Sequence, residues 1–387
     1  MKKDKISLEK YGLVISLVGV TLLFAILTQG KLFTPINVSN VFLQNAHVIV
    51  LSIGMYFCLS TRNVDLSVGS VVAFSGALLG NLTVLGSYSL GTAIVVVIIF
   101  GIFIGFIQGS IIAFLGVPAF ICTLAMELIL RGFTVVLLDS RTLGPFDERL
   151  RYIASGYILP NFKIAGLNVI CIIIFFAFSV AIIYNEFRKI KRKKQYNFDV
   201  PSTSAIIVKL ASVIFGLLFI MYSLARANGM SITMVILIVL MLIYSYIASD
   251  TSFGRKVFAV GANRKAARLS GVLDKKIILA VYVNSAILAS IAGLLVAGRL
   301  NAATAIAGTG YELEAISAVS ISGGPTAGIF STFIGASVMS ILNNGMSVLG
   351  LGQDIQKIVK GIIVVLAVGF DVFSKSRGQA NGLRNKK

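Results

Sequence analysis

Two charged motifs interrupt the apolar runs of this chain and are the first candidates for chemistry. Glu127 and Arg131, in ICTLAMELILRG, are four residues apart and can form an ion pair on one helical face. Asp65 and Ser67, in RNVDLSVGS, precede another apolar run, where an aspartate can cap a helix N-terminus. Because an unpartnered charge is costly at membrane depth, each motif has either a structural partner or a place on a solute pathway. We favour the structural interpretation and retain the pathway as the alternative.

Two neighbouring amides offer a different chemistry, the binding of an uncharged solute. Asn343 and Asn344, in ILNNG, lie near the end of a late apolar run. Each amide has donors and an acceptor that match the hydroxyl groups of a neutral solute. The same groups can instead hydrogen-bond to neighbouring helices, and the sequence leaves both interpretations open.

The motifs of nucleotide, metal and nucleophile chemistry are missing. The glycine cluster GGPTAG at 323–328 has no lysine for a phosphate, so we do not expect this chain to bind ATP. His47 is the single histidine, and Cys58, Cys122 and Cys171 lie in or beside apolar runs without paired spacing. We therefore expect no catalytic residue, no metal site and no bound cofactor.

The elements that position these residues are membrane helices. Of 387 residues, 57% are hydrophobic and 13% are charged, and the mean hydropathy is +0.94. An apolar run of about 20 residues can cross a bilayer, and the chain has enough runs for about 10–12 transmembrane helices. The sequence thus predicts an all-α polytopic integral membrane protein. Expected spans are about 11–28, 44–60, 66–86, 90–115, 117–138, 164–184, 205–224, 230–248, 276–298, 326–345 and 356–373, with a short segment at 312–323 that is either re-entrant or spanning.

The basic residues follow the pattern of cytoplasmic loops. The formal net charge is +19, but the bases collect in short segments between apolar runs, which argues against nucleic-acid binding. This pattern places the N-terminus, with Lys2, Lys3, Lys5 and Lys10, in the cytoplasm, and the first span is expected to be uncleaved. Also cytoplasmic are a basic loop at 185–200, a loop at 249–276 and a basic tail at 374–387. Residues 1–373 form the predicted transmembrane domain.

Three glycines share one face of the expected span at 90–115. Gly101, Gly105 and Gly109 are four residues apart. Small residues let membrane helices approach closely, so we expect a packing interface, with a pore lining as the alternative.

The stretch TSFGRKVFAVGANRKAARLSGV, at 251–272, is basic and lies between apolar runs. Its second half is bounded by Gly261 and Gly271, which indicates a helix of two or three turns. One face holds small and apolar side chains and another holds two arginines: Ala262, Ala266 and Leu269, then Arg264 and Arg268. So short a helix is marginal alone in water and must dock. It either rests on anionic headgroups or enters a groove on a soluble partner.

This stretch resembles the cytoplasmic coupling segment in permease subunits of bacterial sugar ABC importers of the ribose, galactose and xylose type. The matching positions are Gly254, Arg255, Gly261, Asn263, Ala266, Ala267, Ser270 and Gly271, and we add Arg264, Arg268 and Leu269 to the predicted coupling surface. Further similarity lies at 64–80, 116–132, 307–324 and 341–368, in family order. A region at about 185–229 resembles an insertion found in xylose-type and multiple-monosaccharide permeases, which favours xylose or related aldoses.

The resemblance implies a set of partners in the bacterial plasma membrane. Two permease copies would form the pathway, and two ATP-hydrolysing subunits would carry ATP and Mg. An extracytoplasmic sugar-binding protein would contact the outer segments 139–163 and 299–311. Both termini would be cytoplasmic. An ion-coupled secondary sugar carrier and a membrane scaffold for a soluble enzyme are the alternative functions.

Overall fold

The computed structural model describes residues 8–196, 198, 200, 202–366 and 369, and within them the chain is almost entirely helical. This confirms the all-α prediction. The helices before residue 160 are α1 (Leu8–Leu27), α2 (Pro35–Gln44), α3 (Ala46–Ser60), α4 (Val68–Gly80), α5 (Leu90–Ser110), α6 (Ala119–Leu138) and α7 (Glu148–Ser155). Lys2, Lys3, Lys5 and the tail at 374–387 lie outside the described residues.

A two-residue hairpin, β1 (Lys163–Ile164) and β2 (Leu167–Asn168), leads into the second half. Its helices are α8 (Val169–Gln195), α9 (Thr203–Arg226), α10 (Ile232–Asp250), α11 (Ser252–Ala262), α12 (Arg264–Leu269), α13 (Asp274–Leu300), α14 (Tyr311–Ile321) and α15 (Ile329–Val348). A last described helical segment covers 353–366. Short turns complete the order: η1 (Lys31–Phe33), η2 (Asn81–Leu85), η3 (Ile111–Leu115) and η4 (Pro325–Ala327).

The helix lengths support a multi-pass membrane protein. Within the described part of the chain, 8 helices are long and apolar enough to cross a bilayer, and α2 with α3, bent by 43°, makes a ninth. The apolar stretch Gly12–Leu27 of α1 is shorter, so the described part of the chain has eight or nine clear candidates against the 10–12 expected. With 11 residues, α14 is too short to span.

Two of the expected spans are extended by further helix in the structure. The basic sequence at 186–195 was expected to be loop, but α8 continues through Gln195. Its lysines and arginines are good helix formers, and they favour the C-terminal end of the helix dipole. The expected span at 44–60 is the second part of a bent pair, because Asn45 interrupts the helix between α2 and α3.

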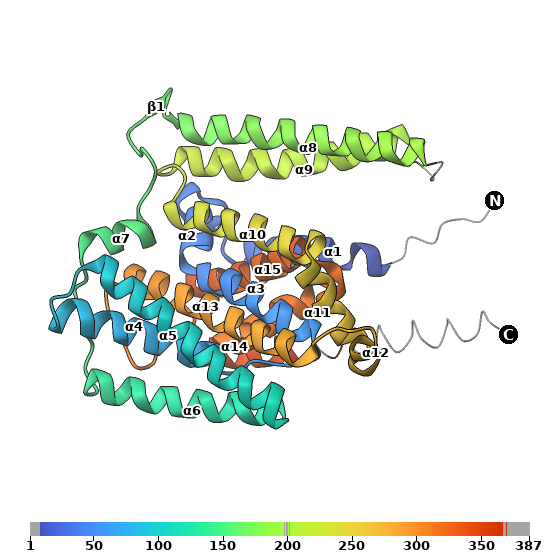
Figure 1. Cartoon of the computed structure of the whole chain (residues 1–387). Coiled ribbons are helices and arrows are strands. Elements are labelled where there is room, and N and C mark those ends of the chain that lie inside the picture. Colours follow the sequence, from blue (N-terminus) through green and yellow to red (C-terminus); the bar gives the residue numbers. More distant parts are fainter. Residues whose placement is uncertain (1–7, 197, 199, 201, 367–368, 370–387) are drawn as a thin grey trace.

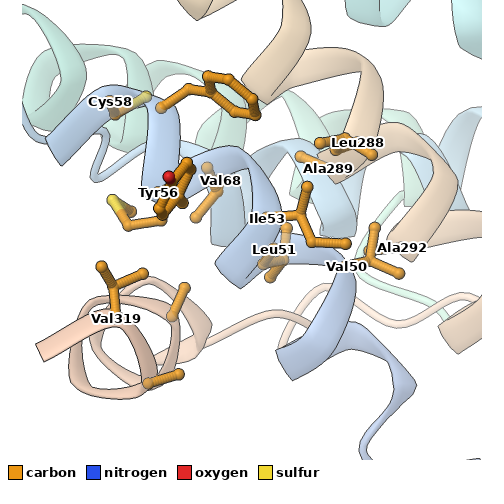
Figure 2. Close-up of a cluster of buried hydrophobic side chains, with 14 of the residues drawn as sticks. Val50, Leu51, Ile53, Tyr56, Cys58, Val68, Leu288, Ala289, Ala292 and Val319 are labelled. Carbon is orange, nitrogen blue, oxygen red and sulfur yellow. The ribbon is translucent and has the colours of Figure 1, made fainter. Parts of the chain in front are cut away.

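Helix α13 lies at the centre of the bundle, against α3, α4 and α5. Small residues on α13 allow these close approaches, and Ala286, Ala289 and Ala292 are all 0% exposed. Figure 2 shows the apolar core where α3 passes between α13 and α14, with these side chains labelled: Val50, Leu51, Ile53, Tyr56, Cys58, Val68, Leu288, Ala289, Ala292 and Val319.

The glycine face of α5 is a packing interface, as predicted. A Cβ atom added to Gly105 would lie 2.5 Å from Cα of Val283 on α13, and one added to Gly109 would lie 3.1 Å from Cβ of Tyr282. Gly101 faces Ser290 in the same way. Side chains on this face of α5 would therefore push α13 away.

The two ends of the bundle carry different elements (Figure 1). Helix α7 and β1 lie at one end, whereas α12 and the C-terminal end of α8 lie at the other. The two strongly basic internal segments thus share an end, as their charge predicts. Helices α8 and α9 form a hairpin along one side of the bundle, where α9 contacts α2.

Candidate coupling surface and polar pathway

The predicted coupling segment folds as two helices instead of one. Asn263 has an extended backbone that ends α11 and begins α12, and its Oδ1 accepts a hydrogen bond of 3.0 Å from the Ala266 N–H. Asparagine is a favoured N-cap, so the break is encoded locally. Ala262, expected on the short helix, is the last residue of α11.

The arginines of α12 are held within the chain. Arg264 Nε donates to Oδ2 of Asp274 over 2.6 Å, and Arg268 donates to the same carboxylate through Nε (3.0 Å) and Nη2 (2.8 Å). These hydrogen bonds raise the pKa of Arg268 above its ordinary value. The two arginines were predicted to face a partner. They fasten α12 to the first residue of α13, and their side chains stay 47% and 61% exposed.

The opposite face of α12 is open. Leu269 is 82% exposed, and Ala262 and Ala266 are also exposed, whereas Ala267 is buried under the helix. The face that the sequence defined by Ala262, Ala266 and Leu269 is therefore exposed, and the Ala262 carbonyl behind it accepts a hydrogen bond of 3.4 Å from Arg62 Nη2. Ser270 follows at the C-cap and is exposed.

The glycines of the segment have structural roles. A Cβ atom on Gly261 would overlap the backbone carbonyl of Ser60, and one on Gly254 would overlap that of Ala248. Gly271 has a φ of +81°, which favours glycine after a helix. Arg255 is exposed and donates to the Asp250 carbonyl over 3.2 Å. The glycines thus hold α11 and α12 against the bundle.

Asp65 and Ser67 lie in a closed polar cluster. Oδ1 of Asp65 accepts the backbone N–H of Ser67 (3.0 Å), so the carboxylate caps the start of α4. Its Oδ2 accepts from Ser285 Oγ (2.8 Å) and Gln108 Nε2 (3.3 Å), which links α4 to α13 and α5. With 0% exposure for both Asp65 and Ser67, the structural interpretation applies.

Glu127 and Arg131 form a loose pair on α6, with 3.9 Å between Nε and Oε1. The stronger contacts of Arg131 are to the loop before α14. Its Nη1 donates to the carbonyls of Ala305 (2.9 Å) and Ala307 (2.7 Å). Arg131 therefore positions that loop, a role that the sequence spacing did not indicate.

The two late asparagines have different surroundings. Asn344 exchanges two hydrogen bonds with Asn37 on α2, over 2.8 and 3.0 Å. Asn343 donates to Oδ1 of Asn45 (3.1 Å) and to Oε2 of Glu314 (2.9 Å). Asn344 thus serves helix packing, whereas Asn343 belongs to a buried charged cluster.

That cluster was missed in the sequence. Glu314 on α14 is 2% exposed, and its carboxylate also accepts from Lys360 Nζ over 2.6 Å. His47 Nε2 lies 3.4 Å from Oε2 of Glu314, and its ring stacks on Tyr311 at 3.7 Å between centroids. Its members are far apart in sequence, which hid their proximity. The acids of YELEA, in an otherwise apolar region, were the available signal.

Known proteins resemble the chain over nearly its whole length. Residues 37–159 and 151–368 match the family described as branched-chain amino acid transport system / permease component. The chain belongs to this family of permease components. No solved structure matches this permease.

Curated relatives of the permease are named as sugar permeases. The xylose transport system permease protein of Haemophilus influenzae is 32% identical over 382 residues, covering 97% of this chain and 99% of the relative. The Escherichia coli xylose transport system permease protein is 30% identical over 378 residues, covering 96% and 94%. The Escherichia coli ribose import permease protein is 30% identical over 363 residues, covering 92% of each. All three are named as permeases and not as enzymes.

Proposed function

We propose that the chain is the transmembrane permease subunit of an ATP-driven ABC importer for a monosaccharide. The observation that carries this proposal is α12. An exposed apolar face ending in Leu269 is fixed in place by Arg264 and Arg268 on Asp274, at the basic end of the bundle. A short rigid helix with an open apolar face suits insertion into a groove on a partner.

The partner at α12 would be an ATP-binding subunit, which would carry the ATP and Mg. This end of the bundle then faces the cytoplasm of a bacterial cell, as do both termini. A second copy of the permease would complete the pathway across the plasma membrane. The coupling surface comprises the exposed residues of α11 and α12, and Gly254, Gly261 and Gly271 support it from behind.

The opposite end offers a surface for an extracytoplasmic sugar-binding protein. A cavity of about 730 Å³ there is bounded by α7 and by Arg299 at the end of α13. Arg149, Arg151 and Tyr152 line it together with Glu148. The cavity joins the two predicted outer segments, 139–163 and 299–311, and the charged side chains in its lining suit a soluble protein or its sugar.

The proposed substrate is xylose or a related aldose. Two of the relatives named above are xylose permeases, and they align with this chain over nearly all of it, the α8–α9 hairpin included. The Asn343 amide, which can donate and accept hydrogen bonds, also suits a neutral sugar.

Reconstitution tests the proposal. Proteoliposomes would contain the permease with the ATPase and the binding protein encoded beside it, and radiolabelled xylose uptake and ATP hydrolysis would be measured together. We expect uptake that requires ATP and both partners. Uptake driven by a proton or sodium gradient without the ATPase would instead establish a secondary carrier. Assembly with the ATPase but no transport of any aldose would leave the scaffold interpretation.

A further inference from the structure

Helix α14 is a short helix buried inside a membrane bundle. Its 11 residues begin after Gly308 and Gly310, whose φ values of +74° and +81° turn the chain into the helix. Half-helices of this kind present their N-termini to solute sites in other transporter architectures. The side chains around the first two turns of α14 are therefore candidates for a solute site.

Around Glu314, the first turns of α14 carry a polar cluster in which its carboxylate is paired with one ammonium group. The Glu314 carboxylate accepts from Lys360 Nζ (2.6 Å) and from Asn343 Nδ2 (2.9 Å). Glu314, Asn343 and His47 are 2%, 7% and 5% exposed. One carboxylate balanced by one ammonium group suits an uncharged solute better than an ion.

An aromatic surface and a route from outside adjoin this cluster. Tyr311 stacks on His47 with an interplanar angle of 19°. Arg299 lines the outer cavity, and the loop after α13 leads from it to Tyr311 at the start of α14. Residues 299–311 thus connect the outer cavity with the cluster.

Some buried polar atoms near the start of α14 have no hydrogen-bond partner in the described structure. They include Oδ1 of Asn343 and Oγ of Ser317. Ser317 lies one turn after Glu314 on the same helix. Buried polar groups are normally satisfied, so unsatisfied ones that converge on one place need an explanation.

We infer that Tyr311, Glu314, Asn343 and His47 form a sugar site on the translocation route, occupied when the bundle opens toward the outer cavity. Glu314 would accept sugar hydroxyl protons, and the amide of Asn343 would both donate and accept. The ring of Tyr311 would cover an apolar face of the sugar. This inference rests on the proposed function, because it assigns the site at which that permease holds its substrate.

The test compares two adjacent asparagines in the reconstituted importer. The quantity measured is xylose transported per ATP hydrolysed, with saturating xylose-loaded binding protein. In N343A we expect this ratio to fall about tenfold, the effect of losing hydrogen bonds to the substrate, while ATP hydrolysis stays at the parental rate. The control N344A removes an amide that pairs with Asn37, so the ratio should stay parental.

A second variant and a second substrate guard against a folding defect. N343S keeps a hydroxyl that can both donate and accept, and we expect an intermediate ratio. N343A should also discriminate less than the parent against deoxy sugars that lack one hydroxyl. A parental ratio and parental discrimination in N343A would overturn the inference, as would a parallel fall of uptake and hydrolysis in both Asn343 variants. A parental importer that moves no aldose would overturn the proposed function itself, before any variant is compared.

Discussion

At the scale of single residues, the exposed face of α12 differs from the rest of its segment. Leu269 is 82% exposed, yet α12 is fastened through Arg264 and Arg268 to a carboxylate whose side chain is only 5% exposed. A helix of six residues would not hold its shape in water without such contacts. The arginines therefore give Leu269 a fixed position.

Replacement of Leu269 tests this role. We expect Leu269→Glu to weaken retention of the ATP-binding subunit about tenfold or more, because a charge would enter an apolar groove. Thermal stability of the permease alone should be unchanged, since the side chain is exposed. The measurement is co-purification of the ATPase with tagged permease. Leu159→Glu, at a residue that is 58% exposed and precedes β1, is the matched control. Parental retention in the Leu269 variant would remove α12 from the coupling surface.

Sequence reasoning identified the faces of this segment but not the carboxylate that its arginines bind. The helical spacing of small and basic residues predicted the open face, because the division of a helix into faces depends only on local geometry. The partner of the arginines, Asp274, follows the turn at Gly271, so the pairing depends on how the chain reverses into α13. For the same reason Glu314 was missed, since Lys360 and His47 approach it only in the folded bundle.

At the scale of elements, packing between α5 and α13 governs how closely the central helices approach. In membranes, association of helices depends on such close contacts, because lipid removes the hydrophobic drive between them. Spacing of Gly101, Gly105 and Gly109 predicted this interface correctly. The glycine spacing did not predict that α13 is the partner helix, because many apolar helices of this chain could pack against such a face.

The glycine face yields a stability prediction. Gly105→Leu should destabilise the permease by about 1–3 kcal/mol, the usual cost of overpacking, because the backbone of Val283 has no room to move. Thermal unfolding in detergent would measure the change. Gly132→Leu in α6 is the control, since nothing lies within 4 Å of a Cβ atom there. Equal stability of the two variants would contradict the packing role.

At the scale of the whole molecule, the α8–α9 hairpin lies along one side of the central bundle (Figure 1). It leaves and rejoins the bundle at one place, where a Cβ atom on Gly229 would lie 2.8 Å from the Asn168 side chain. Its base packs in a small apolar cluster with α10, which includes Cys171, Met221 and Met234. The resemblance to xylose-type permeases predicted an insertion at about 185–229, but the sideways position of the hairpin follows from tertiary contacts such as Phe33 with Phe219.

Removal of this hairpin tests its independence. A variant in which a short glycine-serine linker replaces residues 169–226 should insert in the membrane and retain the ATP-binding subunit at near-parental levels. The reason is that α12 and α13 lie elsewhere in the bundle (Figure 1). Size-exclusion chromatography in detergent and ATPase co-purification are the measurements. Loss of the ATPase from a monodisperse variant would show that the hairpin takes part in coupling.

The central helix connects the two faces of the membrane as one rigid rod. Its 27 residues extend about 40 Å, from Asp274 beneath α12 to Arg299 at the outer cavity. A displacement of one end of α13 therefore reaches the other end through this single helix. In the proposed importer, coupling between the two ends is reciprocal. If the docked binding protein changes the affinity of the permease for the ATPase by some factor, the bound ATPase changes the affinity of the permease for the binding protein by the same factor.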